Sequence, residues 1–283
     1  MLAAAPLPKP ASGHTILNFD ASFAVAVLAA LVAGLVRGFS GFGGALIFMP
    51  VVGALYSPRI AAPTFLILDF ILTLPMSLRA IPACRWPIVP PTAIAAMVTA
   101  PVGAYLLAAG DPVTLRWAIC GVVVLLLALI ASGWRYHGEP KTAASLGVGG
   151  VAGLLGGIGQ ISGPPVIAFW VSGPHPAHMI RANMLVFFMV ISLSSAAAYV
   201  WNGLFSAEIA WLIVVLIPTY AFALYVGSHV FGRYAGRGYR PLAYAIIALA
   251  AITSGRPLTG FFARSPAPVA SGRRHGRSAR RCC

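Results

Sequence analysis

The chain has 283 residues, of which 59% are hydrophobic and only 8% carry a charge. About a quarter of the residues in soluble domains are charged, so 19 basic and 5 acidic side chains are too few to cover a water-exposed surface of this size. The composition excludes an ordinary soluble protein and predicts an all-α integral membrane protein whose solvent is the lipid bilayer.

The first apolar stretch, at 21–36, follows a leading segment at 1–20 and ends in a glycine cluster. It runs into Arg37 instead of a small-residue cleavage site, which argues against a secretory signal. The cluster at 38–44 reads Gly-Phe-Ser-Gly-Phe-Gly-Gly. Clustered glycines relax helical geometry, so we predict a helix break here.

Uncharged intervals mark the next spans, because a transmembrane helix needs about 20 apolar residues. Residues 86–110 and 117–134 each fit one span, and 60–78 makes another that is interrupted by Asp69. An ionisable group inside the membrane is costly and is therefore a functional candidate. Asp69 is predicted either to carry a coupling proton or to balance Arg37, and Arg37 either to hold an anion or to extend to an interface.

A second broken region follows at 142–180, an uncharged run that is too long for one span. Its middle contains clustered glycines at 156–163 and then two consecutive prolines, which lack backbone donors, so a second helix break is predicted. Residues 182–207 and 209–232 fit one span each, and 241–255 makes a short last one.

The two broken regions belong to an internal repeat. The sequence Val-Ala-Gly-Leu at 32–35 recurs at 151–154, and the same displacement places Gly38 on Gly157 and Gly44 on Gly163. We therefore predict a first membrane repeat at 21–136 and a second at 137–260, each with one glycine-broken segment and three transmembrane helices. Counting each broken segment as one crossing gives about eight spans; if these segments are re-entrant hairpins, the repeats are inverted.

Residues 261–283 are rich in Arg, Ser, Pro and Gly and are predicted to form a basic, disordered tail. The tail holds much of the formal net charge of +14. Basic tails and loops beside apolar segments are typical of membrane proteins, so nucleic acid is not an expected partner. No metal site and no cofactor are predicted, because His175 and His178 have no third ligand in sight.

The breaks predict an anion site. A helix that restarts after a break presents free N–H groups and the positive end of its dipole, a combination that binds anions. The second pieces are expected to begin near Gly43 and Gly163, and the repeat brings them together near mid-membrane. The alternative is that the small residues only allow helices to pack closely.

The predicted substrate-binding residues lie in the two clusters or on the helix that follows each. Thr64 and Asn183 are included because the repeat relates them and each is near one cluster. The full set is Arg37, Ser40, Gly41, Gly43, Gly44, Thr64, Gln160, Ser162, Gly163, Pro164 and Asn183, with Asp69 for proton coupling.

Several motifs together resemble the sulfite exporter TauE/SafE family. They are the run GFGGALIFMP at 41–50, SGPP at 162–165, the duplicated halves, and a Val-Gly pair followed by an Arg before the last helix of each half. The resemblance covers about 15–255. It implies a secondary transporter in the bacterial inner membrane whose substrate is a small anion: sulfite, an organosulfonate or a related sulfur compound. The sequence departs from the family pattern at Ala45, Gln160 and Ser162, where glycine is commoner.

Two other functions remain as alternatives. Paired half-helices also line pores, so an anion-selective channel fits the same breaks. An intramembrane enzyme is less expected, because the spans contain no second acid and no HExxH motif.

Overall fold

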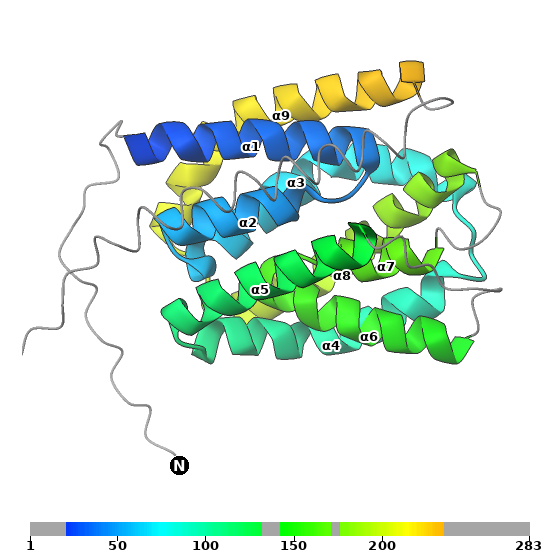
Figure 1. The fold of residues 1–283 in the computed structure, drawn as a ribbon, viewed down its shortest axis with the longest axis horizontal. Coiled ribbons are helices and arrows are strands. Elements are labelled where there is room, and N and C mark those ends of the chain that lie inside the picture. The colour runs from blue at the N-terminus through cyan, green and yellow to red at the C-terminus, as the bar shows by residue number, and fades with distance from the viewer. Residues whose placement is uncertain (1–20, 132–141, 171–175, 235–283) are drawn as a thin grey trace, which may run out of the picture.

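The computed structural model describes residues 21–131, 142–170 and 176–234 (Figure 1). Every regular element within these ranges is helical, and six of the helices are long and apolar enough to cross a membrane. The prediction of an all-α membrane protein is therefore confirmed. The leading segment at 1–20, the last predicted span at 241–255 and the tail at 261–283 lie outside the described residues.

The helices follow the predicted spans closely. They are α1 (Ala21–Ser40), α2 (Gly44–Leu55), α3 (Pro58–Ala80), the 3-10 turn η1 (Ile81–Ala83), α4 (Val89–Ala109), α5 (Pro112–Ala131), α6 (Thr142–Gly159), α7 (Gly163–Trp170), α8 (Ala177–Trp201) and α9 (Ala207–Tyr234). Both predicted helix breaks are present: the first separates α1 from α2, and the second separates α6 from α7.

Each broken segment folds into a helical hairpin with the break at its tip (Figure 1). A Cβ placed on Gly44, the first residue of α2, would lie 3.1 Å from the carbonyl oxygen of Ala33 and 3.2 Å from Cβ of Arg37. The start of α2 therefore lies against the last turns of α1. In the second hairpin, a Cβ on Gly156 would lie 3.3 Å from Oγ of Ser162.

The two hairpins enter the bundle from opposite ends. Arg181, near the start of α8, donates from Nη2 to the carbonyl oxygen of Gly38 at 2.8 Å and lies 3.3 Å from Sδ of Met76. Those partners belong to the last turns of α1 and α3, so α8 begins where α3 ends. Because α2 leads into α3 and α7 leads into α8, the hairpins point toward each other.

Glycines hold two pairs of helices at backbone contact distance. A Cβ at Gly149 or Gly157 of α6 would collide with the carbonyl oxygen of Thr92 or Ala100 in α4. Gly38 makes the matching contact between α1 and α9. These two pairs lie on opposite sides of the bundle (Figure 1). Close backbone approach through small residues is the usual way in which membrane helices associate.

This packing predicts opposite effects for two glycines on one helix. Gly149→Ala places a methyl group against the α4 backbone and should lower the stability by about 1–3 kcal/mol. Gly147→Ala meets nothing within 4 Å and should leave stability unchanged or raise it by about 0.5–1 kcal/mol. Thermal unfolding of the two variants in detergent checks this, and equal melting temperatures would contradict the close packing of α4 and α6.

Candidate functional site

The two hairpin tips are built on the same backbone plan. At the end of α1, Gly41 is left-handed (φ +77) and its N–H donates to the carbonyl oxygen of Arg37 at 2.9 Å. Just after the end of α6, Gln160 is also left-handed (φ 58), and its N–H donates to the carbonyl oxygen of Gly156 at 2.9 Å. A left-handed residue just after the last helical turn is a common way to end a helix and redirect the chain.

The tips meet at one cavity. A Cβ on Gly163 would lie 3.3 Å from Cβ of Phe42, so the start of α7 packs against the first tip. The adjoining cavity is small, with a volume of about 20 Å³. It is lined by Arg37, Gly43, Gly44, Ala45 and Leu46 of the first hairpin, by Gln160, Ile161, Gly163 and Pro164 of the second, and by Phe65, Asp69, Phe188 and Ser192 of α3 and α8.

A buried ion pair forms one wall of this cavity. Nε and Nη2 of Arg37 donate to the two carboxylate oxygens of Asp69, each at 2.7 Å. The hydroxyl of Tyr220 in α9 donates to the same carboxylate at 2.8 Å. The Arg37 guanidinium also donates to the carbonyl oxygen of Gly41 and lies 4.3 Å from the ring centre of Phe188.

This geometry decides how Arg37 is placed. Its side chain is 3% exposed and turned inward, so it does not extend to a membrane interface. The bidentate contact makes Asp69 the counter-charge of Arg37 in this conformation, while its role in carrying a proton stays a prediction. Arg37 and Asp69 carry opposite charges, so together they form an ion pair without net charge.

Two further lining residues, Gln160 and Ser192, are polar but uncharged. Nε2 of Gln160 donates to the hydroxyl of Tyr199 at 3.2 Å, and that hydroxyl donates to the carbonyl oxygen of Gly157 at 2.7 Å. Ser192 adds a hydroxyl from α8. The cavity lining therefore combines one ion pair, on α1 and α3, with neutral polar groups from the second tip and α8.

Several predicted site residues lie away from the cavity lining. Oγ of Ser40 hydrogen-bonds to backbone groups of Val36 and Phe42, and thereby ties the first tip together. Thr64 donates to the carbonyl oxygen of Ile60 one helical turn earlier.

The remaining three predicted residues also point elsewhere. Asn183 accepts the backbone N–H of Arg85 at 2.8 Å, beside the connection between η1 and α4. Ser162 is buried next to Gly156, and Gly41 faces the Arg181 side chain, whose Cγ would lie 2.9 Å from an added Cβ.

Sequence reasoning missed the aromatic part of the site. Phe65, Phe188 and Tyr220 complete the surroundings of Arg37, yet each looks like an ordinary apolar residue of a membrane span. No local motif marks them. A polar hydroxyl within the apolar stretch of α9 was the one available signal for Tyr220, since a buried tyrosine hydroxyl needs a partner.

A family comparison covers the whole of this site. The model of the sulfite exporter TauE/SafE family matches residues 26–254. The chain belongs to the TauE/SafE family. No curated protein and no solved structure matches the chain. As a TauE/SafE member with several membrane-spanning helices, the chain is a multi-pass transporter of the cell membrane, and the resemblance seen in the sequence is confirmed.

Nothing in the described part of this TauE/SafE protein is arranged to bind a metal. No three His, Cys, Asp or Glu side chains come together in residues 21–131, 142–170 and 176–234. The chemistry available at the hairpin tips is ionic and hydrogen-bonding contact with a solute.

The ion pair can be tested by a double-mutant cycle. Asp69→Asn leaves a buried guanidinium without its counter-charge and should cost about 3–5 kcal/mol. The double replacement Arg37→Gln with Asp69→Asn removes both charges and should restore part of the loss. Thermal unfolding of Asp69→Asn, Arg37→Gln and the double variant gives the coupling free energy between the two residues. Strictly additive losses of stability would contradict the pairing.

Proposed function

We propose that this protein is a secondary transporter that carries a small sulfur oxyanion, such as sulfite or an organosulfonate, in the cavity between the hairpin tips. The convergence of both tips and Arg37 on one cavity is the observation that supports this proposal most directly. At about 20 Å³ the cavity holds little more than a water molecule in this conformation, so the tips must part to admit a compact anion.

The first hairpin is proposed to supply most of the backbone donors. The first turn of a helix has N–H groups without partners inside the helix, and no side chain caps the first turn of α2. Gly43 precedes this turn with a left-handed backbone (φ +87), and both Gly43 and Gly44 line the cavity. In α7, prolines at 164 and 165 lack N–H groups, so Gly163 is left as the main donor there.

We further propose that the chain consists of two inverted repeats, 21–136 and 137–260, and that the cavity lies on their pseudo-two-fold axis. The shift along the sequence that superposes the repeated motifs also superposes Gly41 on Gln160. It places Gly44, the first residue of α2, on Gly163, the first residue of α7. It relates Asp69 to Phe188, the two residues that flank Arg37. Transporters built from inverted repeats bind substrate where the repeats meet, and move it by rocking one part against another.

Charge balance links the anion to a proton. An anion that enters beside the neutral Arg37–Asp69 pair would bring an uncompensated negative charge into a buried site, which is unfavourable. If Asp69 takes up a proton, Arg37 is released to pair with a singly charged anion, such as hydrogen sulfite or a sulfonate, and the cavity stays neutral. We therefore propose that one proton accompanies each anion, with Asp69 as its carrier.

Substrate binding can be tested at the second tip. Gly163→Ala places a methyl group 3.3 Å from both Phe42 and Phe188, where it narrows the cavity without large overlap. We expect sulfite flux in proteoliposomes to fall strongly while the melting temperature changes little. Gly147→Ala, on the open face of α6, is the control with normal flux. Undiminished flux in Gly163→Ala would contradict the site, and a joint loss of flux and stability would instead indicate a packing role.

Coupling can be tested separately. Asp69→Asn should transport sulfite down its own gradient but should no longer respond to an imposed pH gradient, measured in proteoliposomes with the amount of folded protein equalised. Flux that still follows the pH gradient would remove Asp69 from the coupling step. Flux that rises linearly with sulfite concentration in the unaltered protein, without saturation, would favour the anion channel.

A further inference from the structure

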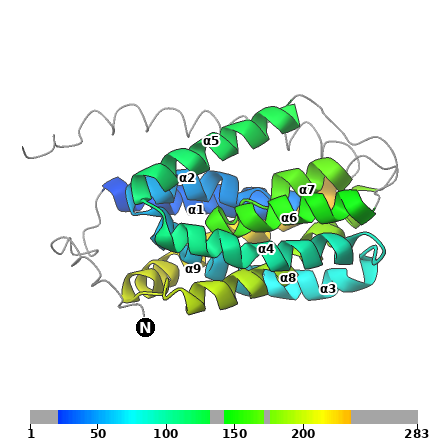
Figure 2. The ribbon, with the colours of Figure 1, turned by 90° about the horizontal axis from the view of Figure 1, so that it is seen from below.

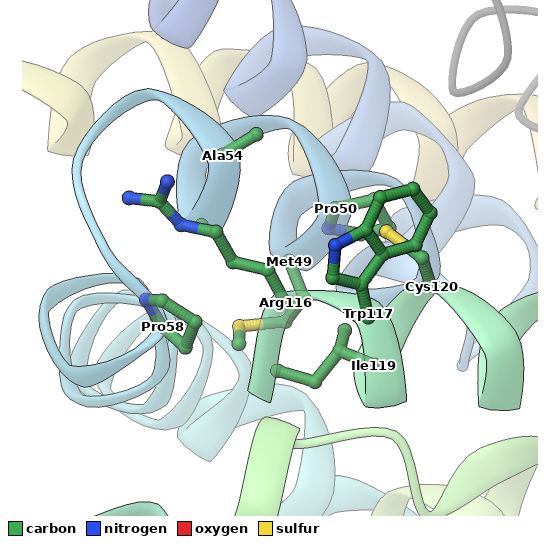
Figure 3. A pocket seen from close by; sticks show the side chains of 9 residues that line it. Met49, Pro50, Ala54, Pro58, Arg116, Trp117, Ile119 and Cys120 are labelled. Carbon is green, nitrogen blue, oxygen red and sulfur yellow. The ribbon is translucent and has the colours of Figure 1, made fainter. Parts of the chain in front are cut away.

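A second small cavity, of about 20 Å³, lies apart from the hairpin tips, where α2 leads into α3 and α5 begins (Figure 3). It shares helix α2 with the first cavity but has no lining residue in common with it. Its wall consists of Met49, Pro50, Gly53, Ala54, Pro58, Arg116, Trp117, Ile119 and Cys120. Figure 2 shows α5 lying obliquely on the outside of the bundle, so this cavity is peripheral.

Arg116 is the charged residue of this otherwise apolar wall, and its hydrogen bonding is incomplete. Nη2 donates to the carbonyl oxygen of Tyr56 at 3.4 Å, which is a long contact. Nε is buried and has no partner among the described residues. In Figure 3 the guanidinium points toward the turn between α2 and α3, away from Trp117. An acceptor brought by a ligand would satisfy a donor that the protein itself leaves unpaired.

The neighbouring charges do not neutralise Arg116. Arg59 follows Pro58 of the cavity wall, and its guanidinium donates to the carbonyl oxygens of Leu107 and Gly110 at the end of α4. The carboxylate of Asp111 accepts the backbone N–H and the hydroxyl of Thr114. This end of the bundle therefore keeps a positive group beside an apolar slot.

We propose that this cavity binds an anionic phospholipid, with an acyl chain in the slot between α2 and α5 and the phosphate on Arg116. Arg116 lies in the second turn of α5, near the end of an apolar helix, and the proposal places it where headgroups meet the hydrocarbon. Trp117 beside it is 60% exposed, as expected of a tryptophan at the membrane interface. A guanidinium suits phosphate, and basic pockets between membrane helices select anionic headgroups.

Cys120 makes occupancy of the cavity measurable. It lines the slot, is partly exposed and forms no disulfide, so a lipid chain in the slot shields its thiol. The full chain is reconstituted in vesicles of phosphatidylcholine alone or with added phosphatidylglycerol. The rate of N-ethylmaleimide modification is then followed at each cysteine by peptide mass spectrometry. We expect phosphatidylglycerol to slow modification of Cys120 several-fold and to leave the rate at Cys84, outside the cavity, unchanged.

Variants in the same membranes separate the lipid site from a general effect of surface charge. Arg116→Gln should abolish the protection by phosphatidylglycerol, whereas Arg116→Lys should keep most of it. Arg79→Gln removes an equal charge at the end of α3 that lies away from Pro58 and the cavity, and it should keep all of the protection. Melting curves confirm that each variant is folded.

Three results would overturn the proposal. The first is an equal rate of Cys120 modification in vesicles with and without phosphatidylglycerol. The second is protection by phosphatidylglycerol that persists in folded Arg116→Gln. The third is equal protection by inorganic phosphate added to phosphatidylcholine vesicles, which would assign the site to a free anion. If Arg116→Gln fails to fold, Ala54→Phe, which fills the slot and keeps the charge, should remove the difference between the two lipids.

Discussion

Hydrocarbon offers no partner to a backbone whose helix has been interrupted, and the fold follows from this constraint. Both breaks must be enclosed by protein or face a polar cavity. Here each break lies at the tip of a hairpin, the two tips pack together through Phe42 and Gly163, and the open backbone faces an internal cavity. The cost of breaking two helices is thereby confined to one place, which is also the place proposed here for the anion.

The ion pair between Arg37 and Asp69 follows from the same enclosure. A lone guanidinium at this depth would be very costly, so its position near the first tip requires a carboxylate and further acceptors. α1 contributes the guanidinium, α3 the carboxylate and α9 the hydroxyl of Tyr220, and these three helices are far apart in sequence. The pair and its tyrosine partner therefore join three helices beside the cavity.

The sequence was sufficient for features that depend on local chemistry. Charge spacing located the helices, and glycine with proline located both breaks, because these residues act on their own backbone. It was not sufficient for features that depend on the direction of a side chain. Asn183 is polar and near the second cluster, yet it turns toward the backbone of Arg85. Phe188 is apolar and has no motif, yet its ring lies over Arg37. Which face of a helix meets the cavity is set by tertiary packing.

Glycine packing also limits how the cavity can open. α1 is packed against α9 and α6 against α4 by backbone contacts that tolerate no added methyl group, so the first long helix of each hairpin is held tightly by its partner helix. The contact of Phe42 with Gly163 joins the two tips, whereas α3 and α8 pack between the two pairs (Figure 1). The proposed transport cycle therefore requires the tips to separate while both glycine-packed pairs stay intact. The ion pair joins α1 to α3 beside the first tip, so under the proposed coupling a proton on Asp69 weakens the attraction between these two helices where the cavity lies.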